Sequence, residues 1–149
     1  MKTIKFSEKI NISSTQEIVF DYTQDYDERL RWDTFLKEAR LIGGATKADK
    51  GAKAYCVAKI GLGMETEYVS FNRPKVTAIK MIRGPFLFKS FLGSWTFNQF
   101  RPGITEVIFL YSFILRFPFN IFTYVIKRNL QANVRQRLLD LKRSIEKSA

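Results

Sequence analysis

The sequence predicts an α+β fold in which one curved antiparallel sheet wraps around a long C-terminal helix. The last fifth of the chain, residues 120–147, carries an apolar stripe at helical spacing. Residues 52–117 instead alternate apolar and polar side chains with a period of two, as strands do. Because strands and helices fall in separate runs, the pattern favours an α+β fold over a wound parallel sheet.

The N-terminal part is expected to form one strand and two short helices. Residues 3–12 alternate as a half-buried strand does. Residues 13–15 (Ser-Ser-Thr) offer an N-cap for the helix that follows, and Ser14 and Glu17 have the spacing of a capping box. A second short helix is expected over residues 28–38. The apolar side chains expected on the buried sides of these two helices are Ile18, Val19, Tyr22, Leu30 or Trp32, Phe35 and Leu36.

About five antiparallel strands are expected to follow, separated by turns rich in glycine and proline. The predicted ranges are 54–60, 64–71, 76–82, 86–100 and 104–117. Pro118 should end the last strand, and Asn120 can cap the final helix.

The final helix organises the fold because its apolar stripe needs cover. Its apolar residues recur at steps of three and four: Ile126, Leu130, Val134, Leu138, Leu141 and Ile145. At 1.5 Å per residue the helix would be about 40 Å long. The natural cover for so long a stripe is the sheet, curved around it.

The composition limits which classes of protein and which kinds of site the chain can form. The 149 residues fit one domain, residues 1–149, with one core. The chain has no histidine and one cysteine, Cys56, which argues against a disulfide, a zinc site and a catalytic triad, and indicates a reducing compartment. The first residues lack the apolar run of a signal peptide, and the longest apolar stretch, 107–115, is too short to span a membrane. We therefore expect a soluble, cytoplasmic protein without metal or cofactor, in which Cys56 is an inert core residue.

The formal charge of +11 is uneven, with a net +2 in residues 1–60 and +5 in residues 120–149. Such a charge favours anionic partners, although a solvated basic surface that aids solubility explains it too. The basic side chains beside the helical stripe are Lys127, Arg128, Arg135, Lys142 and Arg143. They could touch an anionic membrane transiently. Nucleic acid is the weakest candidate partner, because the aromatic residues fall on strand positions that should be buried.

Four pieces of the chain carry a family resemblance by their order and spacing. They are residues 12–22, residues 31–33 (Arg-Trp-Asp), residues 65–74, and the pair 93–97 and 103–107. Together they resemble the polyketide cyclase/dehydrase and lipid-transport proteins of the START-like, Bet v 1-like (SRPBCC) superfamily. The resemblance implies a helix-grip fold with a cavity between sheet and helix that holds a hydrophobic ligand such as a lipid, a quinone or a polyketide-like molecule. It implies no shared catalytic residues.

The predicted ligand-binding residues come from the inner faces of two strands and the helix. They are Trp95, Phe97, Val107, Phe109, Tyr111, Phe113, Leu130, Val134 and Arg137. Aromatic faces of this kind line small-molecule pockets, but they equally fill solid cores. Arg137 falls within the apolar stripe, where it could hold a ligand carboxylate or phosphate. The alternatives are that Arg137 snorkels to the surface or pairs with Glu65 or Glu67.

Glu65 and Glu67 share one strand face and are the polar groups that could act as acid or base inside a cavity; a solvated face is the alternative. Trp32 is expected to pack the short helices on the sheet, and Asp33 to cap or pair locally, unless this segment lines the cavity entrance. The leading hypothesis is a ligand carrier. The rivals are a cyclase or dehydratase using Glu65, Glu67 or Tyr111, and a protein that contacts a partner or membrane through its basic helix. The oligomeric state stays open.

Overall fold

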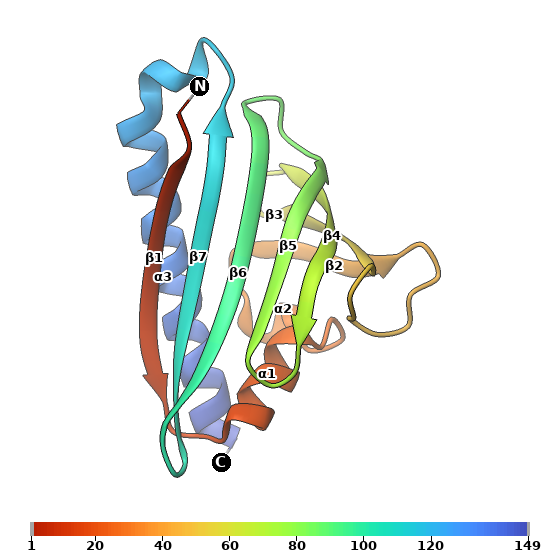
Figure 1. Cartoon of the computed structure of the whole chain (residues 1–149), viewed down its shortest axis with the longest axis vertical. Coiled ribbons are helices and arrows are strands. Elements are labelled where there is room, and N and C mark those ends of the chain that lie inside the picture. The colour runs from red at the N-terminus through yellow and green to blue at the C-terminus, as the bar shows by residue number, and fades with distance from the viewer. Residues whose placement is uncertain (1, 149) are drawn as a thin grey trace.

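One antiparallel sheet and one long helix make up most of the molecule (Figure 1). The computed structural model describes residues 2–148, so the two end residues of the predicted domain lie outside the described part. The elements in chain order are β1 (Ile4–Ile12), α1 (Gln16–Gln24), α2 (Arg29–Trp32), β2 (Leu36–Ile42), β3 (Lys53–Ala58), β4 (Gly63–Asn72), β5 (Val76–Arg83), β6 (Phe88–Arg101), β7 (Ile104–Leu115), the 3-10 helix η1 (Phe119–Phe122) and α3 (Thr123–Ser148).

The seven strands have the order β1-β7-β6-β5-β4-β3-β2, and all their pairings are antiparallel. The sheet curves, and α3 lies behind β1 and β7 in the view of Figure 1. The predicted α+β, helix-grip arrangement is therefore confirmed.

The predicted stripe of α3 is the side that faces the sheet. Val134, Leu138, Leu141 and Ile145 are buried, whereas Ile126 and Leu130 are only partly covered. Its C-terminal part thus packs into the core, and its first turns leave space beneath them.

Strands β6 and β7 supply the aromatic layer of the core. Along β7 every second side chain is buried, so Val107, Phe109, Tyr111 and Phe113 face inward as predicted. Trp95 of β6 packs on Phe109 with 4.1 Å between ring centroids.

The second short helix is shorter than expected: residues 33–35 form a turn, and the last three residues of the predicted range, 36–38, begin strand β2. The helix stops at Trp32, and the Asp33 carbonyl accepts a bond from the Leu36 amide at 3.2 Å. From Leu36 to Ile42 the backbone pairs with β3. Backbone pairing with a neighbouring strand thus overrides the local helical pattern.

The helix caps agree only in part with the prediction. Helix α1 is capped by Thr15, the last residue of the predicted Ser-Ser-Thr run and not the Ser14 of the predicted capping box: the Thr15 hydroxyl accepts a bond from the Ile18 amide at 3.3 Å. Ile18 is exposed, and Phe20 is buried instead, with its ring 5.2 Å from that of Phe97. At the other end of the chain, Asn120 lies inside η1 and does not precede the first residue of α3 as a cap would.

Candidate functional site

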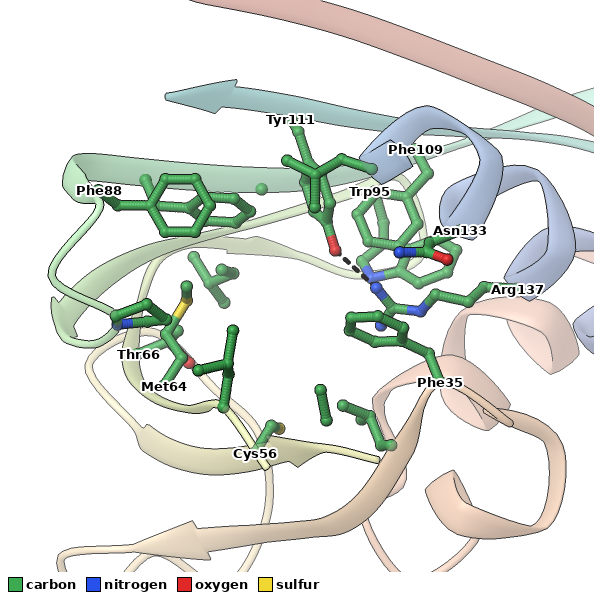
Figure 2. A pocket seen from close by; sticks show the side chains of 18 of the residues that line it. Phe35, Cys56, Met64, Thr66, Phe88, Trp95, Phe109, Tyr111, Asn133 and Arg137 are labelled. Atoms are coloured by element: carbon green, nitrogen blue, oxygen red, sulfur yellow. Dashed lines mark hydrogen bonds between the residues drawn. The ribbon is translucent and has the colours of Figure 1, made fainter. Parts of the chain in front are cut away.

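A cavity of about 400 Å³ lies between the concave face of the sheet and the first turns of α3 (Figure 2). Its walls are mostly apolar, with Phe88 and Phe91 of β6 on one side and Leu36 of β2 on another. Leu130 lines it from the side of α3. The volume is within the range typical of small-molecule pockets. The chain therefore has a cavity where a solid core was the alternative.

Five of the nine predicted ligand-binding residues line this cavity, and four do not. The lining residues are Trp95, Phe109, Tyr111, Leu130 and Arg137. The other four belong to the packed core: Phe97, Val107, Phe113 and Val134. Other core side chains cover them: Phe97 packs on Phe20 of α1, and Phe113 packs on Phe88 and Phe91 of β6. The prediction that they line the cavity is wrong.

Glu65 and Glu67 lie on the opposite side of β4 from the cavity. Met64 and Thr66 line the cavity, and side chains alternate along a strand, so the two glutamates face away from it. Glu67 sits opposite Lys80 of β5 in the strand register. The hypothesis that these carboxylates act inside the cavity is therefore wrong, and the solvated face is the correct alternative.

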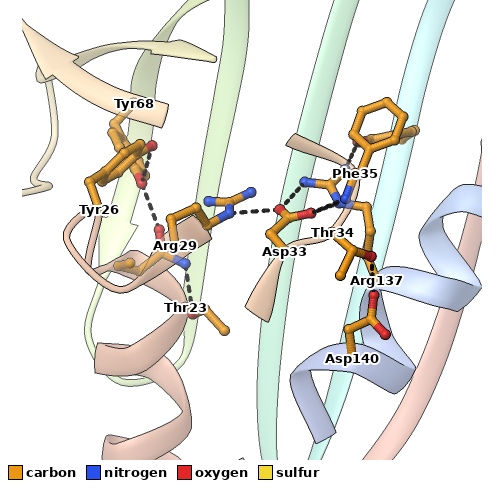
Figure 3. Close-up of polar contacts among 11 residues, drawn as sticks. Thr23, Tyr26, Arg29, Asp33, Thr34, Phe35, Tyr68, Arg137 and Asp140 are labelled. Atoms are coloured by element: carbon orange, nitrogen blue, oxygen red, sulfur yellow. Dashed lines mark hydrogen bonds and ion pairs between the residues drawn. The ribbon is translucent and has the colours of Figure 1, made fainter. Parts of the chain in front are cut away.

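A buried charged cluster forms part of the cavity wall (Figure 3). Arg137 of α3 donates to both oxygens of Asp33, from Nε to Oδ1 at 3.1 Å and from Nη2 to Oδ2 at 2.8 Å. Its Nη1 donates to the Tyr111 hydroxyl at 2.6 Å. Arg29 of α2 donates from Nε to Asp33 Oδ2 at 2.8 Å. Asp33 pairs locally, as predicted, and also binds Arg137 across 104 positions of sequence.

This geometry corrects the predictions for Arg137. The side chain is buried, so it does not snorkel, and its partner is Asp33 instead of Glu65 or Glu67. Because all three guanidinium nitrogens already donate a bond, Arg137 is a positioning group for Asp33 and Tyr111 more than a free anion binder.

The cluster is ionised and carries a surplus positive charge. Burial alone would raise the pKa of Asp33, but Arg137 and Arg29 outweigh it and lower that pKa. Burial opposes the charge of each guanidinium, and Asp33 overcomes this and raises the pKa of both. Two cations and one anion leave a net charge of +1 in the wall. An uncompensated buried charge is costly, so an anionic or strongly accepting group in the cavity would be stabilised here.

Arg29 is the member of the cluster that can receive such a group. Its Nε is bound to Asp33, and among the described residues its two terminal nitrogens have no hydrogen-bond partner. Its guanidinium lies 5.1 Å from the ring centroid of Trp32 and 6.0 Å from that of Tyr26. Since Arg29 also lines the cavity, these two nitrogens are free donors for an occupant.

Two tyrosines beside Arg29 form a hydrogen-bonded chain that ends on Gln24. Tyr68 donates to Gln24 Oε1 at 2.7 Å, and the hydroxyls of Tyr26 and Tyr68 are 3.1 Å apart. Since Tyr68 donates its only proton to Gln24, Tyr26 donates to Tyr68. Burial raises the pKa of both phenols, so both stay protonated at neutral pH. They offer an occupant acceptor oxygens only, which leaves Arg29 as the charged donor on this side of the cavity.

Cys56 lines the cavity and is half-buried, so it is not the core residue that was expected. Burial raises the pKa of its thiol, which keeps it protonated and a poor nucleophile. Within residues 2–148, no three side chains of the His, Cys, Asp and Glu types gather as a metal site.

Sequence patterns did not identify Arg29, Tyr26 and Tyr68 as cavity residues. The spacing of Arg29 and Asp33, four positions apart, is a local signal for their ion pair. Nothing in the sequence connects either residue to Arg137, because that contact depends on how α2 and α3 pack. The two tyrosines carry no local signal of their own.

The fold and the cavity agree with a match to a known protein family. A family model described as "Polyketide cyclase / dehydrase and lipid transport" matches residues 3–146. The chain belongs to this family. No curated protein matches the sequence.

Several solved structures share the START-like fold of this chain. A protein from Thermus thermophilus has a TM-score of 0.82 and 14% identity, covering 98% of this chain and 99% of that one. A START superfamily protein from Mycobacterium smegmatis has a TM-score of 0.77 and 10% identity, with coverages of 95% and 98%. The Zhui aromatase/cyclase from Streptomyces sp. R1128 has a TM-score of 0.75 and 11% identity, with coverages of 97% and 96%. At these identities the likeness is one of fold.

Proposed function

We propose that the chain binds or carries a small hydrophobic ligand that ends in one acidic or strongly accepting group. The observation that carries this proposal is the surplus positive charge at Arg29 in the wall of an otherwise apolar cavity. Family membership supports the hydrophobic part of the ligand. Lipids with a carboxylate, quinones, and phenolic or carboxylic polyketides all fit this description.

The proposed pose follows from where polar and apolar groups lie. The acidic end of the ligand contacts the two free nitrogens of Arg29, near the tyrosine chain. The apolar body lies against Phe88, Phe91 and Trp95. A hydrogen bond to a charged group adds about 1.5–3 kcal/mol, so an acidic ligand should bind roughly ten- to a hundredfold more tightly than its neutral analogue.

Two fluorescent probes test the proposal, because they share one ring system and differ in charge. Anilinonaphthalene sulfonate is anionic, and N-phenyl-1-naphthylamine is neutral. We expect both to bind at one site and the anionic probe to bind more tightly. Arg29→Met should remove this preference and still fold, since the remaining Asp33–Arg137 pair is neutral. Equal affinities for the two probes in the wild-type protein would contradict the role of Arg29.

A matched pair of substitutions on β4 tests the cavity itself. Thr66→Phe places a ring in the cavity, whereas Val69→Phe adds the same ring to a residue that does not line it. We expect the first variant to lose both probes and the second to keep them. Undiminished binding by Thr66→Phe would place the probes elsewhere.

A second candidate function is catalysis of the cyclase or dehydratase type, favoured by the contact between Arg137 and Tyr111. Because the Tyr111 oxygen accepts a bond from Arg137, its own proton is free to point toward a ligand carbonyl in the cavity. The adjacent cation stabilises the negative charge that remains when the phenol gives up this proton. The solved structure of the Zhui aromatase/cyclase has the same fold. If Tyr111→Phe keeps ligand binding and turns over the extracted ligand as fast as wild type, this candidate is wrong.

Three further expectations remain predictions. They are the cytoplasmic location, the single domain over residues 1–149, and transient contact with an anionic membrane. In the part of the chain that the structure describes, no helix is long and apolar enough to cross a membrane.

A further inference from the structure

The cavity opens between the β3–β4 loop and the first turns of α3. Of the residues that line it, four are exposed. Ile60 and Leu62 come from the β3–β4 loop, and Val125 and Asn129 come from α3. The mouth of the cavity therefore lies between these two segments, away from the charged cluster at α2.

A third segment, the β5–β6 loop, adjoins the mouth. Pro85 and Leu87 of this loop line the cavity too. The Arg116 amide donates to the Leu87 carbonyl at 2.8 Å, which joins the loop to the chain just before η1. The Phe86 ring also packs on Phe119 of η1, with centroids 6.5 Å apart. We call residues 59–64, 83–89 and 116–128 together the mouth surface.

The mouth surface exposes large apolar side chains without cover. Six of them are between 64% and 78% exposed: Ile60, Phe86, Phe117, Ile121, Tyr124 and Val125. Single exposed apolar residues are ordinary on protein surfaces, but a group around one cavity mouth indicates an interaction site.

The charge of the mouth surface has one sign. Its three segments contain six basic residues and no acidic one. Beyond these segments, Glu65 follows the first one directly and lies opposite Arg83 in the strand register. From Tyr68 to Leu139 the chain has eleven basic residues and one acidic residue, Glu106. Glu106 is paired in register with Asn11 at the far end of β1, remote from the mouth.

We propose that the mouth surface docks on an anionic phospholipid bilayer, with its apolar side chains inserted and its basic side chains on the headgroups. This combination of aromatic and aliphatic residues with lysine and arginine in the same segments is the one that suits a bilayer interface. The cavity then opens directly onto the acyl region, so a ligand passes between bilayer and cavity without crossing water. This passage of a ligand rests on the proposed function, whereas the docking itself does not need a ligand.

The proposed membrane contact involves the first turns of α3 and not the whole basic helix. Lys127 and Arg128 belong to the mouth surface, whereas Arg143 and Lys147 lie near the opposite end of the helix. Charge attraction to the whole basic helix would use both ends alike, so the two sites can be separated by substitution.

The test is co-sedimentation of the full chain with phosphatidylcholine vesicles, with and without phosphatidylserine. We expect binding to the anionic vesicles at least about tenfold stronger than to the neutral ones. Phe86→Ser/Phe117→Ser should weaken it by about tenfold or more. The matched control is Phe100→Ser. Phe100 is also exposed, at 62%, but it lies near the turn between β6 and β7, at the end of the sheet opposite the mouth surface. Lys127→Gln/Arg128→Gln should weaken binding more than Arg143→Gln/Lys147→Gln.

Each other outcome overturns the proposal. If Phe86→Ser/Phe117→Ser and Phe100→Ser bind alike, the apolar residues of the mouth do not insert. If the wild-type chain stays off vesicles and instead self-associates in a way that Phe86→Ser/Phe117→Ser abolishes, the surface serves a second copy of the chain. Anilinonaphthalene sulfonate binding, measured without vesicles, separates this proposal from the previous one. Probe binding without vesicle binding refutes docking alone, and loss of both refutes both.

Discussion

Replacing Asp33 with asparagine should destabilise the protein much more than the same change at Asp21. Each aspartate receives two hydrogen bonds from one arginine: Asp33 from Arg137 at 3.1 and 2.8 Å, and Asp21 from Arg73 at 2.7 and 2.7 Å. The pairs differ in burial. The Asp33 side chain is 0% exposed and that of Asp21 is 55% exposed. The two substitutions therefore compare the same two-bond contact with one arginine in two environments, with Arg29 as a further partner at Asp33.

The expected magnitudes follow from that difference. Breaking a buried ion pair from one side costs about 3–5 kcal/mol, because the partner charge stays buried without compensation. At Asp33 two guanidiniums, Arg29 and Arg137, would be left in this state. The exposed Asp21–Arg73 pair contributes much less, because water solvates each partner once the other is removed.

Urea unfolding of the wild type and the two variants measures both losses. For a denaturant slope of about 1–3 kcal/mol per molar, Asp33→Asn should lower the midpoint by roughly 1 M or more and Asp21→Asn by much less, with the slope unchanged. Similar midpoint shifts for the two variants would refute the buried, ionised cluster.

A triple variant separates charge from shape. Arg29→Met/Asp33→Leu/Arg137→Met removes the whole cluster and fills its volume with apolar groups. Replacing a buried ion cluster in this way is often nearly neutral for stability. We expect the triple variant to be more stable than Asp33→Asn and to lose the preference for the anionic probe. A triple variant as unstable as Asp33→Asn would show that the loss comes from shape and not from unpaired charge.

Three further predictions concern the core, acid stability and the thiol. Leu138 is 2% exposed and its neighbour Leu139 is 47% exposed. Leu138→Ala should therefore lower the unfolding free energy by about 2–5 kcal/mol, and Leu139→Ala should lower it little. Equal urea midpoints for the two variants would contradict the packing of α3. Because the pKa of Asp33 is lowered in the folded state, the unfolded state binds an extra proton below about pH 4, and the stability of the wild type should fall there. The stability of Asp33→Asn should fall less steeply with pH. Parallel pH profiles for the two proteins would refute this. Because burial raises the pKa of the Cys56 thiol, iodoacetamide should alkylate Cys56 more slowly than an exposed thiol at mildly alkaline pH, and bound probe should slow it further, as followed by mass spectrometry.

The sequence predicted the parts of the fold that depend on local periodicity. The stripe of α3 and the inward face of β7 follow from spacing alone, and both are confirmed. Strand β2 was missed because Lys37, Glu38, Ala39 and Arg40 all favour helices, whereas the pairing that makes them a strand comes from β3.

The site was predictable only in part, for a related reason. The alternation of side chains on β4 was visible in the sequence. Whether the odd- or the even-numbered side chains face the cavity depends on the register with the neighbouring strands, because a shift of one residue moves each side chain to the other face. That register puts Thr66 inside and Glu65 outside, with an irregularity in the β4–β5 pairing between these two residues. The contact of Arg137 with Asp33 joins distant segments, and a single sequence holds no signal for it.

The central claim is that the cavity holds a hydrophobic molecule with an acidic end at Arg29, and native mass spectrometry of the purified protein tests it most directly. We predict a stoichiometric adduct on the wild type and on Val69→Phe, absent from Thr66→Phe, and organic extraction should yield an apolar molecule with an acidic or strongly accepting group. An adduct that persists unchanged in Thr66→Phe would contradict the claim. So would a bare wild-type mass that remains bare after incubation with anilinonaphthalene sulfonate.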